Sequence, residues 1–125
     1  MLKPTIFREY DIRGVAGRDL PDEGVRALGQ AIGTYLQRNS GKRVNVGRDC
    51  RLSGERLRDA LVDGLVASGC DVTDIGVVPT PLLYYSVYPL KADGAVMITG
   101  SHNPPEYNGF KVMCGAGTIH GEQIQ

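Results

Sequence analysis

Hydrophobic residues along this chain follow two different periods that alternate in chain order. Apolar positions three and four residues apart predict amphipathic helices between Pro21 and Asn39 and between Ser53 and Gly69, with Ser53 as the N-cap of the second. A shorter helix is predicted from Thr80 to Tyr88. Short apolar or alternating runs predict strands at residues 43–47, 71–76, 94–99 and 109–113, and an extended segment over residues 5–12 that leads to a loop from residue 14 to residue 17.

Alternating strands and helices predict an α/β fold, a three-layer sandwich with a mixed, mainly parallel sheet flanked by helices. Residues 43–76 form one predicted βαβ unit, and the strand at 109–113 is expected to pair next to the one at 94–99. The 125 residues are one domain's worth of chain. We therefore expect a single domain over residues 1–125.

This topology predicts where a ligand would bind. Open α/β sheets bind ligands beyond the carboxyl ends of their strands. Arg48 and Asp49 follow the strand at 43–47, and Ser101 follows the strand at 94–99. We expect these residues at one edge of the sheet, with Arg13 beside them if the first extended segment joins that edge.

The stretch MITGSHNPPEYNGFK, residues 97–111, carries the candidate chemistry. A hydroxyl (Ser101) stands beside an imidazole (His102) in a segment stiffened by two prolines. An ammonium group, Lys111, follows a predicted turn at Asn108-Gly109. A nucleophile, a titratable ring and a cation in one short segment indicate group transfer.

Charge and composition exclude several classes of partner. Lysine plus arginine equals aspartate plus glutamate, 14 each, so net charge favours neither nucleic acid nor a membrane surface. The chain has no apolar run of the roughly 20 residues that span a bilayer, and its first ten residues lack the apolar segment of a signal peptide. Three cysteines without a CxxC motif indicate neither a disulfide framework nor a zinc site. We expect a cytoplasmic protein that binds neither nucleic acid nor membrane.

The segment TGSHNPPEYNGFK resembles the phosphoserine loop of the α-D-phosphohexomutases, and among them the bacterial phosphomannomutase/phosphoglucomutase branch. The segment FREYDIRG, residues 7–14, looks like the N-terminal active-site loop of that family. VGRDCR at residues 46–51 and VPTP at residues 78–81 also match. The resemblance runs through nearly the whole chain, and it covers the first of the four domains of such an enzyme.

The resemblance implies a role for each candidate residue. Ser101 would carry a phosphoryl group between turnovers, and Lys111 would be the general acid/base. A lysine normally titrates near ~10.4, so the neighbouring cation Arg13 would help to lower its pKa. Arg13 would also face the phosphoserine. Tyr10 and His102 would contact the sugar phosphate, although a loop-stabilising histidine remains an equal alternative for His102.

The same resemblance implies Mg²⁺, held by an oxygen of the phosphate on Ser101 and by three aspartates of a second domain. We expect domains 2–4 to be absent from this chain, since no such aspartate loop occurs and the last five residues begin a helical pattern and stop. The full-length parent would be a monomer that interconverts hexose 1- and 6-phosphates through a hexose 1,6-bisphosphate. The isolated domain would have little or no turnover.

Other interpretations of the same residues stay open. Arg48, Asp49 and Arg51 are expected to brace the loops first and to shape the electrostatics second. The chain as a whole could instead be a non-catalytic phosphosugar-binding module, or a serine-dependent hydrolase that uses Ser101 and His102. The preference among mannose, glucose and amino sugars cannot be inferred from these residues.

Overall fold

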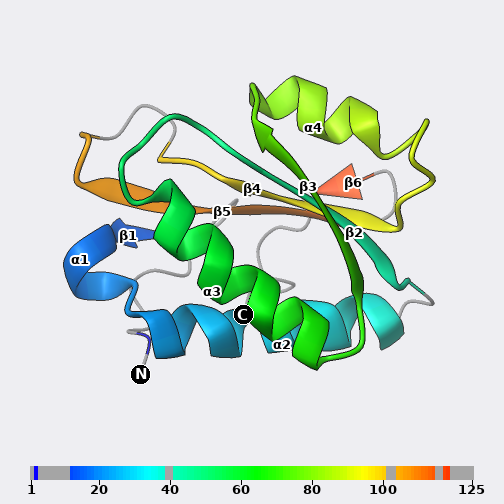
Figure 1. The fold of residues 1–125 in the computed structure, drawn as a ribbon, viewed down its shortest axis with the longest axis horizontal. Coiled ribbons are helices and arrows are strands. Elements are labelled where there is room, and N and C mark those ends of the chain that lie inside the picture. Colours follow the sequence, from blue (N-terminus) through cyan, green and yellow to red (C-terminus); the bar gives the residue numbers. More distant parts are fainter. Residues whose placement is uncertain (1, 3–11, 39–40, 101–103, 115–116, 119–125) are drawn as a thin grey trace.

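One mixed β-sheet organises the molecule, with helices on both of its faces (Figure 1). The computed structural model describes residues 2, 12–38, 41–100, 104–114 and 117–118. The strand order is β1-β5-β4-β2-β3, and β6 pairs with β5. The strands are β1 (Ile12–Val15), β2 (Arg43–Arg48), β3 (Asp71–Val77), β4 (Gly94–Ile98), β5 (Tyr107–Cys114) and β6 (Gly117–Thr118).

The direction of the strands confirms the predicted sheet. β2 is parallel to both β3 and β4, while β5 is antiparallel to β1, β4 and β6. Among the described strands β5 alone therefore runs against the others. The predicted βαβ unit corresponds to β2, α3 and β3, and the predicted pairing of β5 with β4 is also confirmed.

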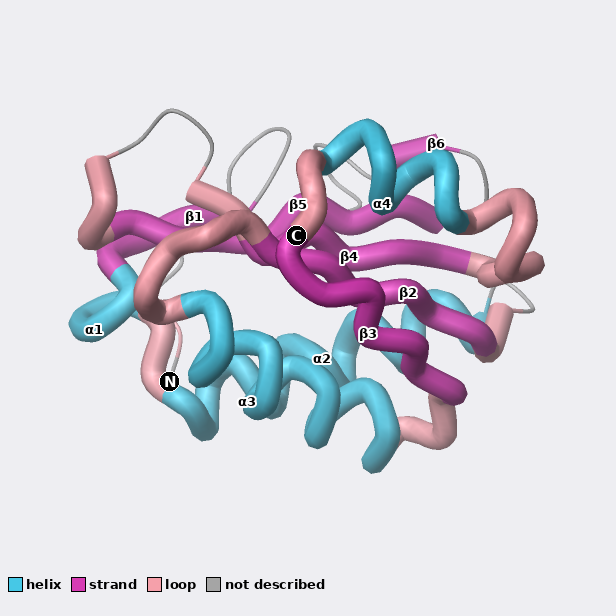
Figure 2. Tube along the Cα trace, turned by 45° about the horizontal axis from the view of Figure 1, so that its top comes forward, coloured by secondary structure: helices cyan, strands magenta, loops and turns pink. Residues whose placement is uncertain are grey.

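The helices form the two outer layers. α2 and α3 lie on one face of the sheet and α4 on the other, as the tilted view shows (Figure 2). The helices are α1 (Ala16–Asp19), α2 (Asp22–Arg38), α3 (Gly54–Ala67) and α4 (Thr80–Ser86). None of the helices in the described ranges is long and apolar enough to cross a bilayer.

Each face of the sheet has its own apolar core, because side chains alternate across a strand. Val96, Ile98 and Phe110 pack with α2 and α3. Met97 and Met113, the intervening positions, pack with α4. The continuous burial of β4 on both faces explains its unbroken apolar sequence.

The contact between α2 and α3 depends on two glycines. A Cβ on Gly64 would overlap the carbonyl oxygen of Arg26 and lie 2.8 Å from the amide nitrogen of Gln30. A Cβ on Gly29 would overlap the carbonyl oxygen of Leu61. These two glycines let the helix backbones approach each other directly.

Some elements differ from the prediction. α1 occupies part of the predicted loop at residues 14–17, and its start is fixed by the Asp19 carboxylate, which accepts a hydrogen bond of 2.9 Å from the Val15 amide. α4 ends at Ser86, two residues before the predicted end. β6 is not predicted by the sequence pattern. Residues 3–11 and 119–125 lie outside the described residues.

Candidate active site

Neighbouring strands end together at one edge of the sheet. Arg48 at the end of β2 is the register partner of Ile98 at the end of β4, and the two strands are parallel. The Asp49 amide continues the pairing and donates to the Ile98 carbonyl at 3.0 Å. Asp49 and Thr99 therefore leave the sheet side by side, as the sequence predicts.

β5 and β1 extend the same edge. The Thr99 amide donates to the Gly109 carbonyl at 2.9 Å, and Gly109 is the register partner of Arg13. A Cβ on Gly109 would overlap the Ile12 carbonyl oxygen and lie 2.9 Å from the Arg13 Cα. Because position 109 has no side chain, β1 can pair closely enough to bring Arg13 to this edge.

Arg13 and Lys111 lie on the same face of the sheet. Lys111 is two residues beyond Gly109 on β5, so it is a diagonal neighbour of Arg13, and such positions are typically about 7–8 Å apart. Lys111 pairs with Met97, whose side chain packs on the α4 face. Both cationic residues are half-buried. The register thus brings together the two cations that the sequence singled out.

The remaining predicted site residues, Tyr10, Ser101 and His102, lie outside the described residues. The structure does describe the residues on either side of the serine position, up to Gly100 and from Pro104. Within the described ranges no group of three His, Cys, Asp or Glu side chains could hold a metal ion. The described side chains therefore do not supply the ligand set implied for Mg²⁺.

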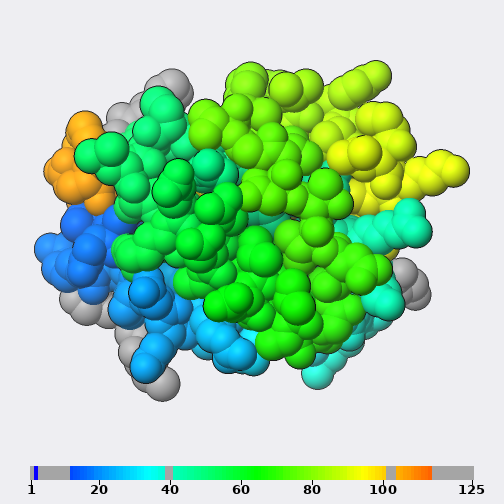
Figure 3. All heavy atoms as spheres, in the orientation of Figure 1, coloured from blue at the N-terminus to red at the C-terminus, as the bar shows by residue number. Residues whose placement is uncertain are grey.

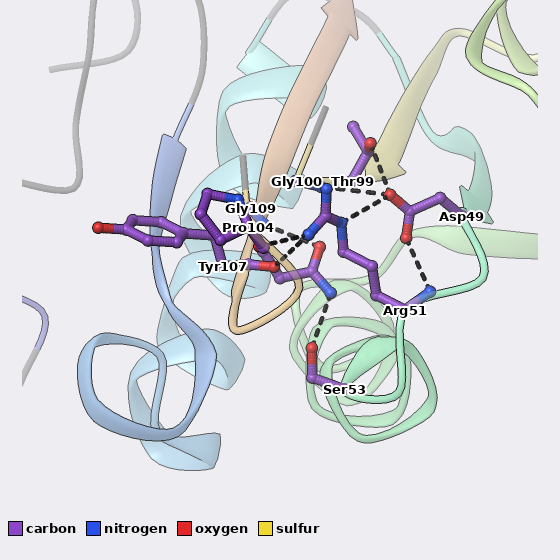
Figure 4. A network of polar contacts seen from close by, with 9 residues as sticks. Asp49, Arg51, Ser53, Thr99, Gly100, Pro104, Tyr107 and Gly109 are labelled. Carbon is purple, nitrogen blue, oxygen red and sulfur yellow. Dashed lines mark hydrogen bonds and ion pairs between the residues drawn. The ribbon is translucent and has the colours of Figure 1, made fainter. Parts of the chain in front are cut away.

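Arg51 joins the far end of the serine segment, which we define as residues 99–107, to the loop between β2 and α3. Its Nη1 donates to the carbonyls of Pro104 at 2.7 Å and of Tyr107 at 3.2 Å (Figure 4). Its Nε lies 3.2 Å from Oδ2 of Asp49, and 13% of the Arg51 side chain is exposed. On the molecular surface the segment that begins at Pro104, in orange, lies against the loop around residue 51, in green (Figure 3).

Asp49 holds the near end of the serine segment. Its Oδ2 accepts hydrogen bonds from the Thr99 hydroxyl at 2.8 Å and from the Gly100 amide at 3.3 Å (Figure 4). Its Oδ1 accepts from the Arg51 amide at 3.2 Å. The predicted bracing role of Asp49 and Arg51 is confirmed.

Arg48 has a different environment. Its Nη1 lies 3.8 Å from Asp74 and its Nη2 lies 4.0 Å from Glu55, so it joins β2 to a charged cluster over α3 and β3. Burial by itself raises the pKa of Asp74, but the hydrogen bond from Gly76 and the guanidinium of Arg58 outweigh it, and the pKa is lowered. Arg48 was predicted to brace a loop, as Asp49 and Arg51 do, but these ion-pair partners lie in α3 and β3.

The turn predicted in this segment was wrong. Asn108-Gly109 is not a turn, because both residues lie inside β5. Asn108 is fully buried and its Nδ2 donates to the Ser53 hydroxyl at 2.9 Å. Ser53 itself has helical dihedrals and makes no side-chain N-cap bond to α3. An Asn-Gly pair is a common turn signal. The same pair also occurs inside a strand, where here the asparagine is buried and the glycine makes room for a neighbouring strand, and the sequence does not distinguish the two cases.

Comparison with known proteins places these features in a family context. A family model described as phosphoglucomutase/phosphomannomutase, alpha/beta/alpha domain I, matches residues 4–125. The chain is 51% identical over 124 residues to the phosphomannomutase/phosphoglucomutase of Pseudomonas aeruginosa, and the match covers 99% of this chain and 27% of that relative. It is 46% identical over 110 residues to the phosphoglucomutase/phosphomannomutase of Thermococcus kodakarensis, covering 86% of this chain and 24% of the relative.

A solved structure has the same fold. The phosphoglucomutase/phosphomannomutase family protein of Burkholderia thailandensis matches with a TM-score of 0.93 at 44% identity. The match covers 100% of this chain and 29% of that one. The chain therefore spans 24–29% of the length of these relatives.

Proposed function

The chain belongs to the phosphoglucomutase/phosphomannomutase family, as its α/β/α domain I, and we propose that it is the phosphoserine-bearing domain of an enzyme that interconverts hexose 1-phosphates and hexose 6-phosphates. Because the chain spans about 27% of its curated relatives, the activity belongs to a longer parent. That parent would include the remaining three domains, act as a monomer and work in the cytoplasm.

One observation supports this proposal above the others. The described ends of the serine segment leave the sheet at the edge where Arg13 reaches β5, and Lys111 lies on the same face as Arg13. A phosphoryl group near this edge would meet cations that balance its charge. Arginine is suited to this task because its planar fork matches phosphate oxygens.

The proposed reaction has two transfers. In the first, the bond between phosphorus and the Ser101 oxygen breaks as a hydroxyl oxygen of the hexose phosphate bonds to phosphorus, and the proton of that hydroxyl passes through Lys111 to the serine oxygen that leaves. The resulting hexose 1,6-bisphosphate reorients. In the second transfer the Ser101 oxygen bonds to the phosphorus of the other phosphate of this bisphosphate as the bond from that phosphorus to the sugar oxygen breaks, and the serine proton passes through Lys111 to the released sugar oxygen.

The other residues have supporting parts in this proposal. Tyr10 and His102 would contact the phosphate of the sugar, and Arg13 would face the phosphoserine. Mg²⁺ would bind to a phosphate oxygen on Ser101 and to aspartates of the second domain, where it would neutralise charge on the transferred group.

Phosphopeptide mass spectrometry of the full-length parent tests the proposal. We expect incubation with a hexose 1,6-bisphosphate to place a phosphate on Ser101, and we expect a hexose monophosphate to remove it. A Ser101→Ala variant is the control for the site of labelling, and Ser68→Ala, in the helix-end turn after α3, is the control for a serine elsewhere in the fold. Stable binding without a covalent phosphate would instead support a phosphosugar-binding module, and labelling by an acylating probe that requires His102 would support a hydrolase.

A further inference from the structure

A single ion pair contacts the serine segment on both sides of the serine. Asp49 binds the segment before position 101, through Thr99 and Gly100, and Arg51 binds it after position 103, through the carbonyls of Pro104 and Tyr107. Both residues come from the loop after β2, a segment far away in the sequence (Figure 4). The pair therefore acts as a bridge across the base of the serine segment.

The two contacts of the bridge lie close together along the chain. Only three residues separate Gly100 from Pro104, and a residue spans at most about 3.3–3.6 Å of extended chain. Pro104 and Pro105 have φ angles that are fixed by their rings. The bridge therefore contacts described residues close to position 101 in the sequence, on both sides of it.

We propose that Arg51 is a positioning residue for phosphoryl transfer: through its ion pair with Asp49 it closes the base of the serine segment and thereby holds Ser101 in line with the phosphate to be transferred. This inference rests on the proposed mutase function. The proposed role is indirect, because Nε and Nη1 of Arg51 are directed at a carboxylate and two carbonyls of the chain itself.

The chemistry of the contacts requires an arginine. One guanidinium reaches the carboxylate with Nε and the two carbonyls with Nη1, in directions fixed by its plane. A lysine carries the same charge on a single nitrogen and cannot hold both groups at once in this geometry. Arg51→Lys therefore removes the bridge while it keeps the charge.

The chain offers a matched control in Arg56. Its Nη1 donates to the Leu20 carbonyl at 3.0 Å, and its Nη2 donates to the Ala16 carbonyl at 2.9 Å. It also pairs with Asp22 at 2.6 Å. Arg56 thus binds two backbone carbonyls and one aspartate, as Arg51 does, but it joins α3 to α1 and α2.

The experiment compares Arg51→Lys and Arg56→Lys in the full-length parent. Its readouts are the urea midpoint, kcat, KM for a hexose 1-phosphate, and the rate at which a hexose 1,6-bisphosphate labels Ser101. We expect Arg51→Lys to lower kcat and the labelling rate by about 10- to 100-fold, because small displacements of a reacting group have effects of this size. We expect KM to change by less than about threefold, since the residue does not bind substrate.

A second measurement separates positioning from folding. Arg56→Lys should lower the urea midpoint about as much as Arg51→Lys and leave kcat within about twofold. Millimolar guanidinium ion should restore part of kcat to an Arg51→Ala variant by occupying the vacated site, and it should not restore Arg56→Ala. If Arg51→Lys does not fold, Asp49→Asn weakens the same bridge with an isosteric side chain and should lower kcat in the same way.

Three results would overturn the inference. Wild-type kcat in Arg51→Lys would show that the bridge is unnecessary. Equal losses of kcat and stability in both lysine variants would reveal a purely structural role, and a raised KM at constant kcat would mean that Arg51 binds substrate. Absence of Ser101 label in the wild-type parent is a different failure, since it overturns the proposed mutase function and the inference with it.

Discussion

At the scale of single residues, the Asp49–Arg51 bridge leaves no space for a side chain at position 100. A Cβ at this position would overlap the guanidinium carbon of Arg51 and lie 2.8 Å from its Nη1. The end of an arginine side chain can usually move aside. Here it is held by Asp49 and by the carbonyls of the serine segment, so a methyl group must displace either the bridge or the segment.

We therefore predict that Gly100→Ala lowers kcat of the full-length parent by about 10-fold or more. The same substitution in an Arg51→Ala background should have a much smaller effect, because the space it needs is then open. Steady-state kinetics of the two single variants and the double variant measure this coupling. Additive losses would show that Gly100 acts independently of Arg51.

Asp93 offers a prediction about pH at the other end of the sheet. Its Oδ2 accepts hydrogen bonds from the amides of Lys42 at 2.8 Å and Arg43 at 2.9 Å, and those bonds lower the pKa of the carboxyl group. An unfolded aspartate titrates near about 3.9. Because the folded pKa is the lower one, the stabilisation is fully present above that pH and is lost as the pH falls through the folded value.

We predict that Asp93→Asn is less stable than the wild type at pH 7, since a neutral amide oxygen accepts these bonds more weakly than a carboxylate. The difference in the free energy of unfolding should narrow below about pH 4. Urea unfolding between neutral and acidic pH measures it. Asp71→Asn is the control, because its carboxylate faces the exposed Lys42 amine at 4.0 Å. A difference in the free energy of unfolding that does not change with pH would contradict the lowered pKa of Asp93.

At the scale of secondary-structure elements, the α2–α3 crossing depends on missing side chains. A methyl on Gly64 would meet backbone atoms of α2, which cannot rotate away as a side chain does. Overpacking costs about 1–3 kcal/mol, and alanine recovers up to about 1 kcal/mol through its higher helix propensity. The overpacking term is the larger of the two.

We predict that Gly64→Ala lowers the free energy of unfolding by about 1–2 kcal/mol. Gly17→Ala in α1 is the control, since nothing lies within 4 Å of its added Cβ, and it should be neutral or stabilising by about 0.4–1 kcal/mol. Chemical denaturation of the two variants gives the comparison. Equal stability of Gly64→Ala and the wild type would show that the helices separate at little cost.

The elements themselves could be predicted from the sequence, and the reason is periodicity. β4 is apolar at every position because both of its faces are buried, and α2 shows a regular apolar stripe. α1 could not be predicted, because four residues contain too little periodicity and its start depends on the contact between Asp19 and Val15. Hydrophobic periodicity therefore identifies long helices and strands, and it does not identify an element as short as α1.

The site was predictable to a different extent. The topology of the predicted sheet indicated the edge at which the site would lie. The pairing of Arg13 with Gly109 was missed, because Gly109 was interpreted as part of a turn. The contact between Asn108 and Ser53 joins residues 55 positions apart, and no local pattern signals such a bond. Sequence motifs suggested candidate residues for the site, whereas long-range packing determines which of the described ones lie together.

At the scale of the whole molecule, the cores and the site differ in how complete they are. The two apolar clusters are closed by this chain's own helices, on both faces of one sheet. A chain of this length can bury enough surface to fold alone. The proposed metal ligands and sugar contacts, in contrast, would come from the other domains of a parent about four times as long.

We therefore predict that the 125-residue chain, expressed alone, unfolds cooperatively in urea and has no measurable mutase turnover. Its backbone would hold Arg13 and Lys111 on one face, but charge neutralisation and substrate orientation would be missing, and each is worth orders of magnitude in rate. The measurement is conversion of hexose 1-phosphate with Mg²⁺ and hexose 1,6-bisphosphate, for the isolated chain and the full-length parent at equal concentration. Turnover by the isolated chain comparable to that of the parent would mean that this one domain holds the complete catalytic machinery.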